Sequence, residues 1–469
     1  MKMYVDGKWI ETKQNIEVLN PYNQEIVDTV PSAGPFEVER ALASAERGAR
    51  VMAELPAHRR AEILRQTASL LLERSEEFAR LLALEVGKPI REARMEVDRA
   101  AFVMNLSAEE AGRLFGETMA MDSAVGGEGK FGLTLRVPCG VVVAIAPFNF
   151  PLSLISHKIG PALAAGNAVI AKPASDTPLT ALKLTELLLA SGLPPEGIQT
   201  LTGQGSTVGE LLVSDRRVRK VSFTGSPAVA RRLTQVAGIK KLSLELGSNS
   251  PVVIMADADL DLAVRALTAT GYANAGQVCI STQRVLVEKS IYNEFLERFR
   301  PSVGVLITGD QMDETTQVGP LIRESDARRV EDWIKDAVNN GGRLITGGSR
   351  DGSVVKPAIV ADVQPRFRIS CDELFGPAVA VTPVDSLDEA IALANNTSYG
   401  LSAAIFTRDI SNIRRFAREI QSGNIHINWG TQWRVDMMPY GGLKDSGIGK
   451  EGPRYAVEEM TELKMVVMH

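Results

Sequence analysis

The sequence is poor in the residues that build disulfide frameworks and metal centres. Its 469 residues include only three cysteines, Cys139, Cys279 and Cys371, and four histidines, at no spacing that suits a metal ion. A disulfide framework and a zinc site are therefore not expected. We expect a cytoplasmic protein, because a free thiolate persists in a reducing compartment.

Long hydrophobic runs and an excess of one charge are also missing. The longest apolar run, residues 139–146, is far shorter than the roughly 20 residues that cross a bilayer. The first ten residues contain no apolar stretch of signal-peptide length, so secretion is not expected. Lys plus Arg (52) nearly balances Asp plus Glu (57), unlike the basic surface of a nucleic-acid-binding protein. Neither a membrane nor a nucleic acid is expected as a partner.

The order of apolar segments predicts an α/β fold. Short strand-like segments fill residues 1–31, and long helices are predicted from residue 34, over 58–84 and over 90–115. From residue 139 to 245 strand-like runs alternate with helical segments, including one at 208–213, and a second alternating set follows residue 248. Such alternation implies parallel sheets covered on both faces. We predict two doubly wound parallel-sheet domains.

Two further segments read as exposed β structure. Residues 119–135 are rich in glycine and then alternate Phe131, Leu133 and Leu135; the resemblance to a known family described below implies a protruding hairpin here, with a floppy loop as the alternative. Residues 462–469 form an apolar, strand-like end with no partner nearby in the sequence. Because an unpaired edge invites aggregation, we expect a homodimer or a homotetramer.

Three separated residues suggest a catalytic set. Cys279 lies in a stretch of small residues before the strand-like run 283–288, and a thiolate is a strong nucleophile. A buried structural cysteine is the alternative that residue type alone favours. Glu245 is flanked by leucines, and Asn149 lies between two prolines after the strand-like run 141–146. A thiol, a carboxylate and an amide make a nucleophile, a general base and an oxyanion donor.

These stretches and four others resemble the aldehyde dehydrogenase superfamily, in the right order and over essentially the whole chain, and the pattern is most similar to lactaldehyde dehydrogenases. The other four are Lys172-Pro173-Ala174, Phe223-Thr224-Gly225-Ser226, Glu373-Leu374-Phe375-Gly376-Pro377 and residues 439–447. The resemblance implies a Rossmann-like cofactor domain (1–117 and 138–247), a catalytic domain (248–444) and a small β oligomerisation arm (118–137 and 445–469). It also implies that the C-terminal end of the chain joins the hairpin of a neighbouring subunit's sheet.

The resemblance also implies a reaction, the oxidation of a short aldehyde to its acid with NAD or NADP. Cys279 attacks the carbonyl, the Asn149 side chain and the Cys279 N–H hold the oxyanion, and Glu245 activates water against a thioester. Relatives that pass the acyl group to coenzyme A generally lack this glutamate, so hydrolysis is favoured. A coenzyme A-acylating enzyme and a protein that lost the chemistry remain alternatives. Lys158 is a lesser candidate for tuning Cys279, with a lysine facing solvent or a neighbouring helix as the alternative.

No Gly-x-Gly-x-x-Gly fingerprint follows a strand, so the cofactor residues are assigned from the resemblance. Ser175 stands where many NAD-using members carry a glutamate, and a serine does not repel a 2′-phosphate, although the adjacent Asp176 restores part of that repulsion. For Lys172 a solvated lysine is the alternative, and for Glu373 a charged loop. The candidates are Ala146, Pro147, Phe148, Lys172, Ser175, Gly205, Gly209, Phe223, Gly225, Ser226, Leu246, Glu373 and Phe375.

The substrate residues are also assigned from the resemblance: Arg99, Phe150, Leu154, Val278, Ile280, Trp433, Arg434 and Tyr440. Two arginines on one pocket would clamp an anionic group. The predicted substrate is thus a lactaldehyde-like hydroxyaldehyde or an anionic aldehyde, with succinate semialdehyde and glyceraldehyde 3-phosphate as alternatives. Val278, where phosphate-binding members carry an arginine, speaks against the last. Arg99 in a surface pair and Arg434 as a brace of its own loop are the competing interpretations.

Overall fold

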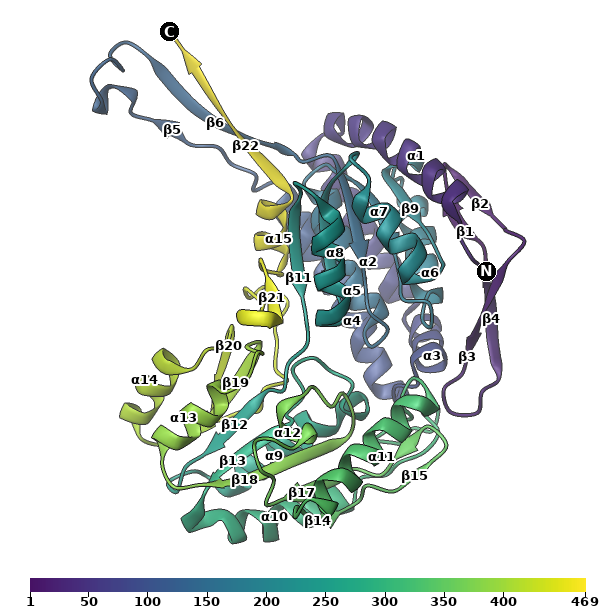
Figure 1. The fold of residues 1–469 in the computed structure, drawn as a ribbon. Helices are drawn as coiled ribbons and strands as arrows, with labels where there is room; N and C mark the ends of the chain where they lie inside the picture. The colour runs from purple at the N-terminus through teal and green to yellow at the C-terminus, as the bar shows by residue number, and fades with distance from the viewer.

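Two twisted sheets, one above the other, organise the computed structural model, which describes residues 1–469 (Figure 1). The upper sheet has eight strands in the order β2-β1-β9-β8-β7-β10-β11-β21, and its five central strands run parallel. The strands are β1 (Met3–Val5), β2 (Lys8–Ile10), β7 (Val141–Ile145), β8 (Ala168–Lys172), β9 (Ile198–Thr200), β10 (Val218–Thr224), β11 (Lys241–Glu245) and β21 (Gly447–Ile448).

Helices cover both faces of the upper sheet because its strands are apolar on both sides. Val142 and Ala144 of β7 join one core and Val143 the other. The first core packs under α2 (Ala57–Glu73), α3 (Ser75–Val86), α4 (Ile90–Ala111) and α5 (Pro151–Ala164), and the second under α1 (Pro35–Glu54), α7 (Glu210–Ser214) and α8 (Pro227–Ala237), while α6 (Leu179–Ala190) contributes to both. The hairpin β3 (Asn15–Leu19) and β4 (Ile26–Pro31) lies outside this sheet.

The lower sheet has seven strands in the order β14-β17-β18-β13-β12-β19-β20, and all but β14 are parallel to their neighbours. Its strands are β12 (Pro251–Ile254), β13 (Arg284–Glu288), β14 (Arg343–Thr346), β17 (Ala358–Ala361), β18 (Ala378–Val384), β19 (Ser402–Phe406) and β20 (Asn424–Ile427). The helices around it are α9 (Leu260–Tyr272), α10 (Tyr292–Gly304), α11 (Glu324–Asn339), α12 (Arg368–Cys371), α13 (Leu387–Asn395) and α14 (Ile410–Glu419). A small hairpin joins β15 (Arg350–Asp351) to β16 (Val354–Val355).

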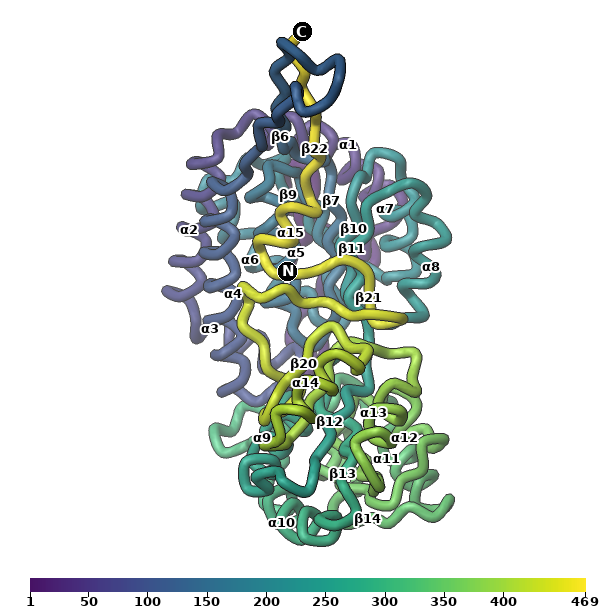
Figure 2. The backbone as a smooth tube through the Cα atoms, turned by 90° about the vertical axis from the view of Figure 1, so that its left-hand side faces the viewer, coloured from purple at the N-terminus to yellow at the C-terminus, as the bar shows by residue number.

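A three-stranded arm projects from the top of the molecule (Figures 1 and 2). It consists of β5 (Thr118–Met119), β6 (Phe131–Pro138) and β22 (Thr461–Met468). β22 pairs with β6 of its own chain from Thr461↔Pro138 to Met468↔Phe131, so the last segment has a strand partner within the chain. Because β22 lies at the edge of this sheet, the expected contact with a neighbouring subunit stays a prediction. Before the arm, the C-terminal segment passes between the two sheets (Figure 2).

The predicted fold class, α/β with two parallel-sheet halves and a β arm, is confirmed, whereas the domain limits stay a prediction. One local expectation, a single helix over 58–84, was wrong, and two other elements differ in detail. The helix predicted over 58–84 is two helices that meet at Arg74, and the segment 208–213 begins as a π-helical turn, Gly205–Gly209, before α7. The tail also contains α15 (Pro453–Glu459), a short helix whose seven residues carry too little periodicity to be recognised.

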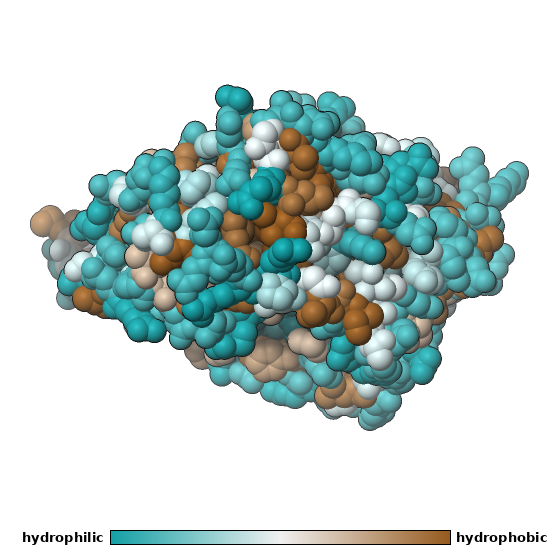
Figure 3. Space-filling view, turned by 90° about the horizontal axis from the view of Figure 1, so that it is seen from below, coloured by the Kyte–Doolittle hydropathy of each residue, from teal (hydrophilic) through white to brown (hydrophobic).

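No helix combines the length and apolar character needed to cross a membrane. The underside of the lower half is mostly hydrophilic, with a few apolar patches near its middle (Figure 3).

One buried carboxylate joins two helices of the upper half. Glu85, in the last turn of α3, is fully buried and accepts hydrogen bonds from the N–H groups of Leu179 (2.8 Å) and Thr180 (3.1 Å) and from the Thr180 hydroxyl (2.5 Å) at the start of α6. Glu85→Ala removes the acceptor of all three donors, and each buried donor left unpaired costs roughly 1–3 kcal/mol. We expect a lower urea midpoint for Glu85→Ala and a smaller loss for Glu85→Gln, which keeps one acceptor. Equal midpoints for wild type and Glu85→Ala would contradict this role.

Candidate active site

The predicted functional residues meet at the carboxyl edge of the upper sheet, above the lower half. Ile145 at the end of β7 lies opposite Lys172 of β8 and Phe223 of β10, and Thr224 lies opposite Glu245 of β11. Because parallel strands end at one edge, the segments after them converge there. In open α/β sheets this edge is where ligands bind.

The loop that presents Cys279 has a constrained backbone. After α9, Asn274 and Ala275 adopt left-handed conformations, with φ of 47° and 54°. Gly276 follows at φ 69°, where a Cβ would overlap the carbonyl of Gly376. A side chain at that position is excluded both by conformation and by space. The loop turns sharply enough to place Cys279 at the edge of the upper sheet, with its Sγ 3.2 Å from the hydroxyl of Tyr440.

Asn149 is tied to this cysteine loop. Its side-chain Nδ2 donates to the carbonyl of Gln277 (2.8 Å), and its own carbonyl accepts from Nδ2 of Asn274 (3.2 Å). Asn149 is buried, and its Oδ1 has no partner. The turn after β7 and the loop after α9 therefore form one unit, with an amide N–H close to the cysteine.

Glu245 ends β11 in a dry environment. It is 2% exposed, and neither carboxylate oxygen has a hydrogen-bond partner. Burial, followed by the charge of Glu451, raises the pKa of Glu245 well above its ordinary value, which favours the neutral acid. Burial likewise raises the pKa of the Cys279 thiol to about 12, against the opposite effect of its hydrogen bond with Tyr440. Both shifts favour the neutral, protonated forms of the two groups.

A buried ionic network lies next to Glu245 and Cys279, and most of it was not predicted from the sequence. Lys158 donates to Glu451 (2.8 Å) and to Oγ1 of Thr224 (2.7 Å), and Glu451 also accepts from Arg434 (3.3 Å). The interpretation of Lys158 as facing solvent was wrong, because its side chain is 1% exposed. Glu451 follows a glycine-rich turn, and nothing in its neighbours signals that a carboxylate will be buried there.

Both predicted arginines reach one carboxylate, Asp436. Arg99 donates to it from Nη2 (2.7 Å), and Nε of Arg434 lies 3.7 Å from it. His157 completes the group at 3.0 Å from Asp436, and burial, followed by the charge of Arg434, lowers the pKa of His157 to about 4. Arg99 therefore does not make a surface pair along its own helix. The two arginines are brought together, as predicted, although Asp436 and His157 were not foreseen.

Apolar side chains line the space around the cysteine. Val278, Ile280 and Tyr440 form a buried cluster with Leu401, against which Phe150 and Cys279 pack. The guanidinium of Arg434 stacks over the ring of Tyr440, 4.0 Å from its centroid. The other two candidates are less closely tied to this cluster. Leu154 is half-buried one turn along α5, and Trp433 is 51% exposed and packs edge-on against His426.

The residues assigned to the coenzyme's ribose and adenosine end lie beside β8. Lys172 is buried, so the solvated-lysine interpretation was wrong, and burial lowers its pKa to about 8. Ser175 donates to the carbonyl of Gly203 (2.9 Å). Asp176 forms an ion pair with Arg323 (3.1 Å), which reaches across from the lower half. The negative charge next to Ser175 is thereby matched.

The remaining coenzyme candidates suit a pyrophosphate and a second ribose. Ser226 caps α8, and a Cβ on Gly225 would overlap the ring of Phe223, so the strand-to-helix turn needs this glycine. A helix start of this kind offers free N–H groups to phosphate. Glu373 is half-buried in the loop after α12, its pKa is raised to about 7 by burial, and it accepts from the N–H of Ser248 (3.0 Å).

The other residues predicted to contact the coenzyme lie at the same carboxyl edge of the upper sheet. Phe148 and Phe375 pack edge to face at 5.8 Å, while Gly205 and Gly209 open onto free space in the π-helical turn. Ala146 and Pro147 follow β7, and Leu246 follows β11. A lysine, a capped helix start and a carboxylate in these positions fit a dinucleotide such as NAD or NADP, whose chemistry is to accept a hydride.

The fold and the site together define a dinucleotide-dependent dehydrogenase of the α/β class. The family model described as "Aldehyde dehydrogenase family" matches residues 9–466. The chain is 46% identical over 467 residues to a 3-sulfolactaldehyde dehydrogenase of Priestia aryabhattai, covering 100% of this chain and 98% of that protein. It is 39% identical over 471 residues to a lactaldehyde dehydrogenase of Methanococcus aeolicus, covering 100% of both.

A solved structure gives the same result. The glyceraldehyde-3-phosphate dehydrogenase GapN of Methanocaldococcus jannaschii, complexed with NADP, superposes with a TM-score of 0.94 at 38% identity, covering 97% of this chain and 100% of that one. The chain belongs to the aldehyde dehydrogenase family. The prediction of an aldehyde dehydrogenase that uses NAD or NADP is confirmed.

Proposed function

We propose that the enzyme oxidises a short hydroxyaldehyde that carries an anionic group, with a sulfonate as the best fit, to the corresponding acid. The observation that carries this proposal is the Nε of Arg434, a buried guanidinium N–H without a hydrogen-bond acceptor. Buried donors of this kind are rare because leaving them unpaired is costly. A substrate oxygen next to Arg434 would satisfy it.

The charges around Arg434 support an anion. Three permanent cations face two carboxylates, while burial keeps His157 and Glu245 neutral: the cations are Arg99, Lys158 and Arg434, and the carboxylates are Asp436 and Glu451. The excess positive charge comes from Arg99, whose side chain is 34% exposed, while the buried Lys158 and Arg434 are matched in number by the two carboxylates. An anionic substrate group next to Arg434 would add to the compensation that solvent gives Arg99.

The distance that the substrate must span is short. The ring of Tyr440 contacts Arg434 on its face and Cys279 through its hydroxyl. A three-carbon chain is therefore long enough to reach from the thiol to the guanidinium. The relatives named for 3-sulfolactaldehyde, lactaldehyde and glyceraldehyde 3-phosphate all act on three-carbon aldehydes, and two of these aldehydes are anionic.

In the first half of the proposed reaction, Cys279 is the nucleophile. Before the aldehyde binds, its thiol loses its proton to water. The thiolate then adds to the aldehyde carbon, and the side-chain amide of Asn149 together with the Cys279 N–H stabilises the oxyanion. NAD or NADP, when bound, accepts the hydride from that carbon, which leaves a thioester on Cys279. Burial of Cys279 and Glu245 excludes bulk water from this stage.

In the second half, Glu245 acts as the general base. Its carboxylate takes a proton from water, and the resulting hydroxide attacks the thioester and releases the acid and the thiol. A raised pKa suits this role because a more basic carboxylate is a better proton acceptor. The same residue argues against coenzyme A as the acyl acceptor.

The proposal also includes the oligomeric state and the cellular compartment of the enzyme. The arm exposes apolar side chains on β6 and β22, including Phe131, Leu463 and Met468, at 48%, 58% and 50%. Burying them against another copy would form a homodimer or a homotetramer. The three free cysteines suit a cytoplasmic enzyme. The domain limits of the sequence prediction are retained.

NADP is the proposed coenzyme. Ser175 carries no charge, and Asp176, the nearest carboxylate, is neutralised by Arg323. The repulsion that would exclude a 2′-phosphate is therefore absent, and Lys172 and Arg323 supply positive charge at this end of the site.

Replacing the general base should separate the two halves of the reaction. Glu245→Gln keeps the shape but accepts no proton, so we expect a burst of about one reduced coenzyme per active site and then a turnover about 10²-fold slower or worse. In the wild type, kcat should rise with pH as Glu245 ionises, with a midpoint well above pH 4.5. The variant should lose that limb. Full steady-state turnover in stopped-flow absorbance measurements would exclude this role.

Arg434→Gln should change substrate preference. We expect kcat/KM for 3-sulfolactaldehyde to fall about 10- to 100-fold, equivalent to about 1.4–2.8 kcal/mol, because one charged hydrogen bond is lost. Lactaldehyde, which has the same three-carbon hydroxyaldehyde chain without the sulfonate, should change less than about threefold and reports on the integrity of the site. Arg434→Lys, which keeps the charge without the forked donors, should lie in between. Equal losses of kcat/KM on both aldehydes would show that Arg434 only stabilises the conformation of its own loop.

Ser175→Glu should reverse the coenzyme preference. A carboxylate beside the 2′-phosphate should weaken NADP binding about 100-fold, near 2.7 kcal/mol, and leave NAD binding nearly unchanged. Ser175→Gln has the same size without the charge and serves as the matched control. Titration of intrinsic tryptophan fluorescence measures both dissociation constants directly. Similar NADP affinities for the two variants would show that charge at residue 175 does not govern the choice.

A further inference from the structure

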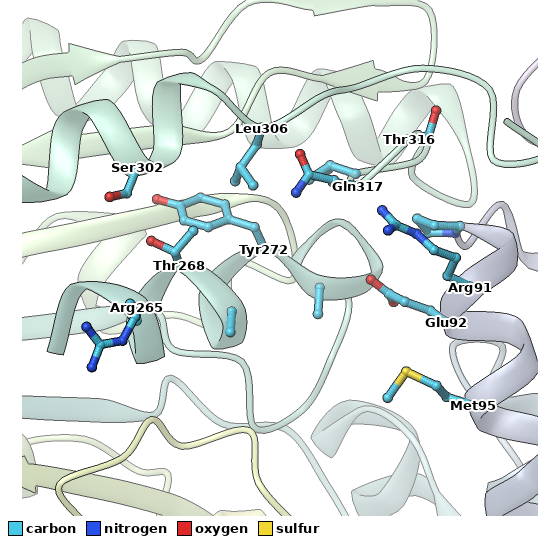
Figure 4. A pocket seen from close by; sticks show the side chains of 14 residues that line it. Arg91, Glu92, Met95, Arg265, Thr268, Tyr272, Ser302, Leu306, Thr316 and Gln317 are labelled. Carbon is cyan, nitrogen blue, oxygen red and sulfur yellow. The ribbon is translucent and has the colours of Figure 1, made fainter. Parts of the chain in front are cut away.

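A groove separate from the catalytic pocket lies on the far side of the cysteine loop (Figure 4). It has a volume of about 590 Å³ and is bounded by the start of α4, the outer side of α9 and the segment that follows α10. None of Cys279, Glu245, Asn149 or Phe150 lines it. Its size suits a small organic molecule, since ligand pockets range from about 300 to 1,000 Å³.

Two arginines give the groove a positive character. Arg265 and Arg91 lie at opposite sides of it (Figure 4), and neither forms an ion pair. Between them lies Glu92, the acidic side chain of the lining, whose pKa burial raises to about 7. The groove is therefore suited to an anion, since its cations are unmatched and its carboxylate is only partly ionised at neutral pH.

The floor of the groove is apolar. It includes the ring of Tyr272, whose hydroxyl is already used by the carbonyl of Ala358 (3.0 Å), together with Leu306 and the small side chains of Ala269 and Ala273. An apolar floor between two guanidinium groups matches a molecule with an anionic head and an apolar body. Arginine favours carboxylate and sulfonate heads because its planar fork bonds two oxygens at once.

The groove is mechanically connected to the active site. Ala273 lines it and is also the first residue of the turn that carries the strained Asn274. Glu92, from the opposite wall, accepts a hydrogen bond from the N–H of Asn274 (2.9 Å). Asn274 in turn holds the carbonyl of Asn149, whose amide is hydrogen-bonded to Gln277. A displacement of Glu92 or of Ala273 would thus move the loop that presents Cys279.

We propose that this groove binds a small amphipathic anion, a carboxylate or sulfonate on a short apolar body, and that its occupation changes the reactivity of Cys279 through Glu92 and Asn274. The ligand acts from outside the substrate pocket. It shifts the reactivity of Cys279 only as far as it binds the two arrangements of the loop with different affinity.

The binding experiment uses three probes with the same chain: octanoate, octan-1-ol and octylammonium. Calorimetric titration of the full-length enzyme should show octanoate binding at least about tenfold tighter than octanol, with octylammonium weakest. Blocking Cys279 with iodoacetamide should leave octanoate binding unchanged. Arg91→Ser combined with Arg265→Ser should weaken it about tenfold. Arg300→Ser, an exposed arginine of α10 that does not line the groove and forms no ion pair, is the matched control.

The coupling experiment measures the rate at which iodoacetamide alkylates Cys279. We expect saturating octanoate to change this rate at least threefold in the wild type and not in Glu92→Ala, which removes the contact with Asn274. Glu92→Gln retains an acceptor and should keep the effect, which guards against simple misfolding. If octanoate bound only before alkylation, or competed with the aldehyde, its site would be the substrate pocket and the proposal would be overturned. So would unchanged affinity in the double variant, no binding up to about 10 mM, or an alkylation rate that octanoate does not alter.

Discussion

Charge buried at the junction of the two sheets is the constraint on which the rest of the structure depends. Lys158 on α5, Glu451 of the C-terminal segment and Arg434 of the preceding loop are almost free of solvent contact. An isolated charge in such a place costs several kcal/mol, and removing one member of a pair leaves the other uncompensated. The C-terminal segment must therefore pass between the sheets, where Figure 2 shows it, because only there are its charges matched.

The same dryness sets the chemistry. Glu245 and Cys279 lie against this network without strong partners of their own, so burial raises the pKa of both. Burial favours the neutral form of each group, and in the proposed reaction each acts only after it gives up a proton. A site that stores both groups in their neutral forms avoids burying two more negative charges beside Glu451. Reactivity is thus tied to binding events that change the local charge.

Local pattern in the sequence predicted much of this molecule and failed where contacts are distant. Strands such as β7 and β8 were recognisable because they are continuously apolar, and the residues that follow them were placed at one edge by the geometry of parallel sheets. Cys279, Glu245 and Asn149 were found through the motifs around them. Asp436 and His157 carry no local signal, since their importance comes from partners on α4 and on the loop after β20. The short helix α15 and the break at Arg74 are decided by packing rather than by propensity.

On the proposed function, the loop between β20 and β21 surrounds the substrate, whereas the proposed reacting groups lie on other elements. Cys279, Glu245 and Asn149 are positioned by strand ends and by a strained turn, which tolerate little change. Arg434 and Asp436 instead belong to an irregular segment whose conformation is held by side-chain contacts with α4 and α5. A substitution of Arg434 changes the charge beside the proposed substrate site and also affects Tyr440, on which Arg434 stacks and which hydrogen-bonds Cys279. On the proposed function, the Nε of Arg434, which is buried without a hydrogen-bond acceptor, is the group that the anionic end of the aldehyde meets.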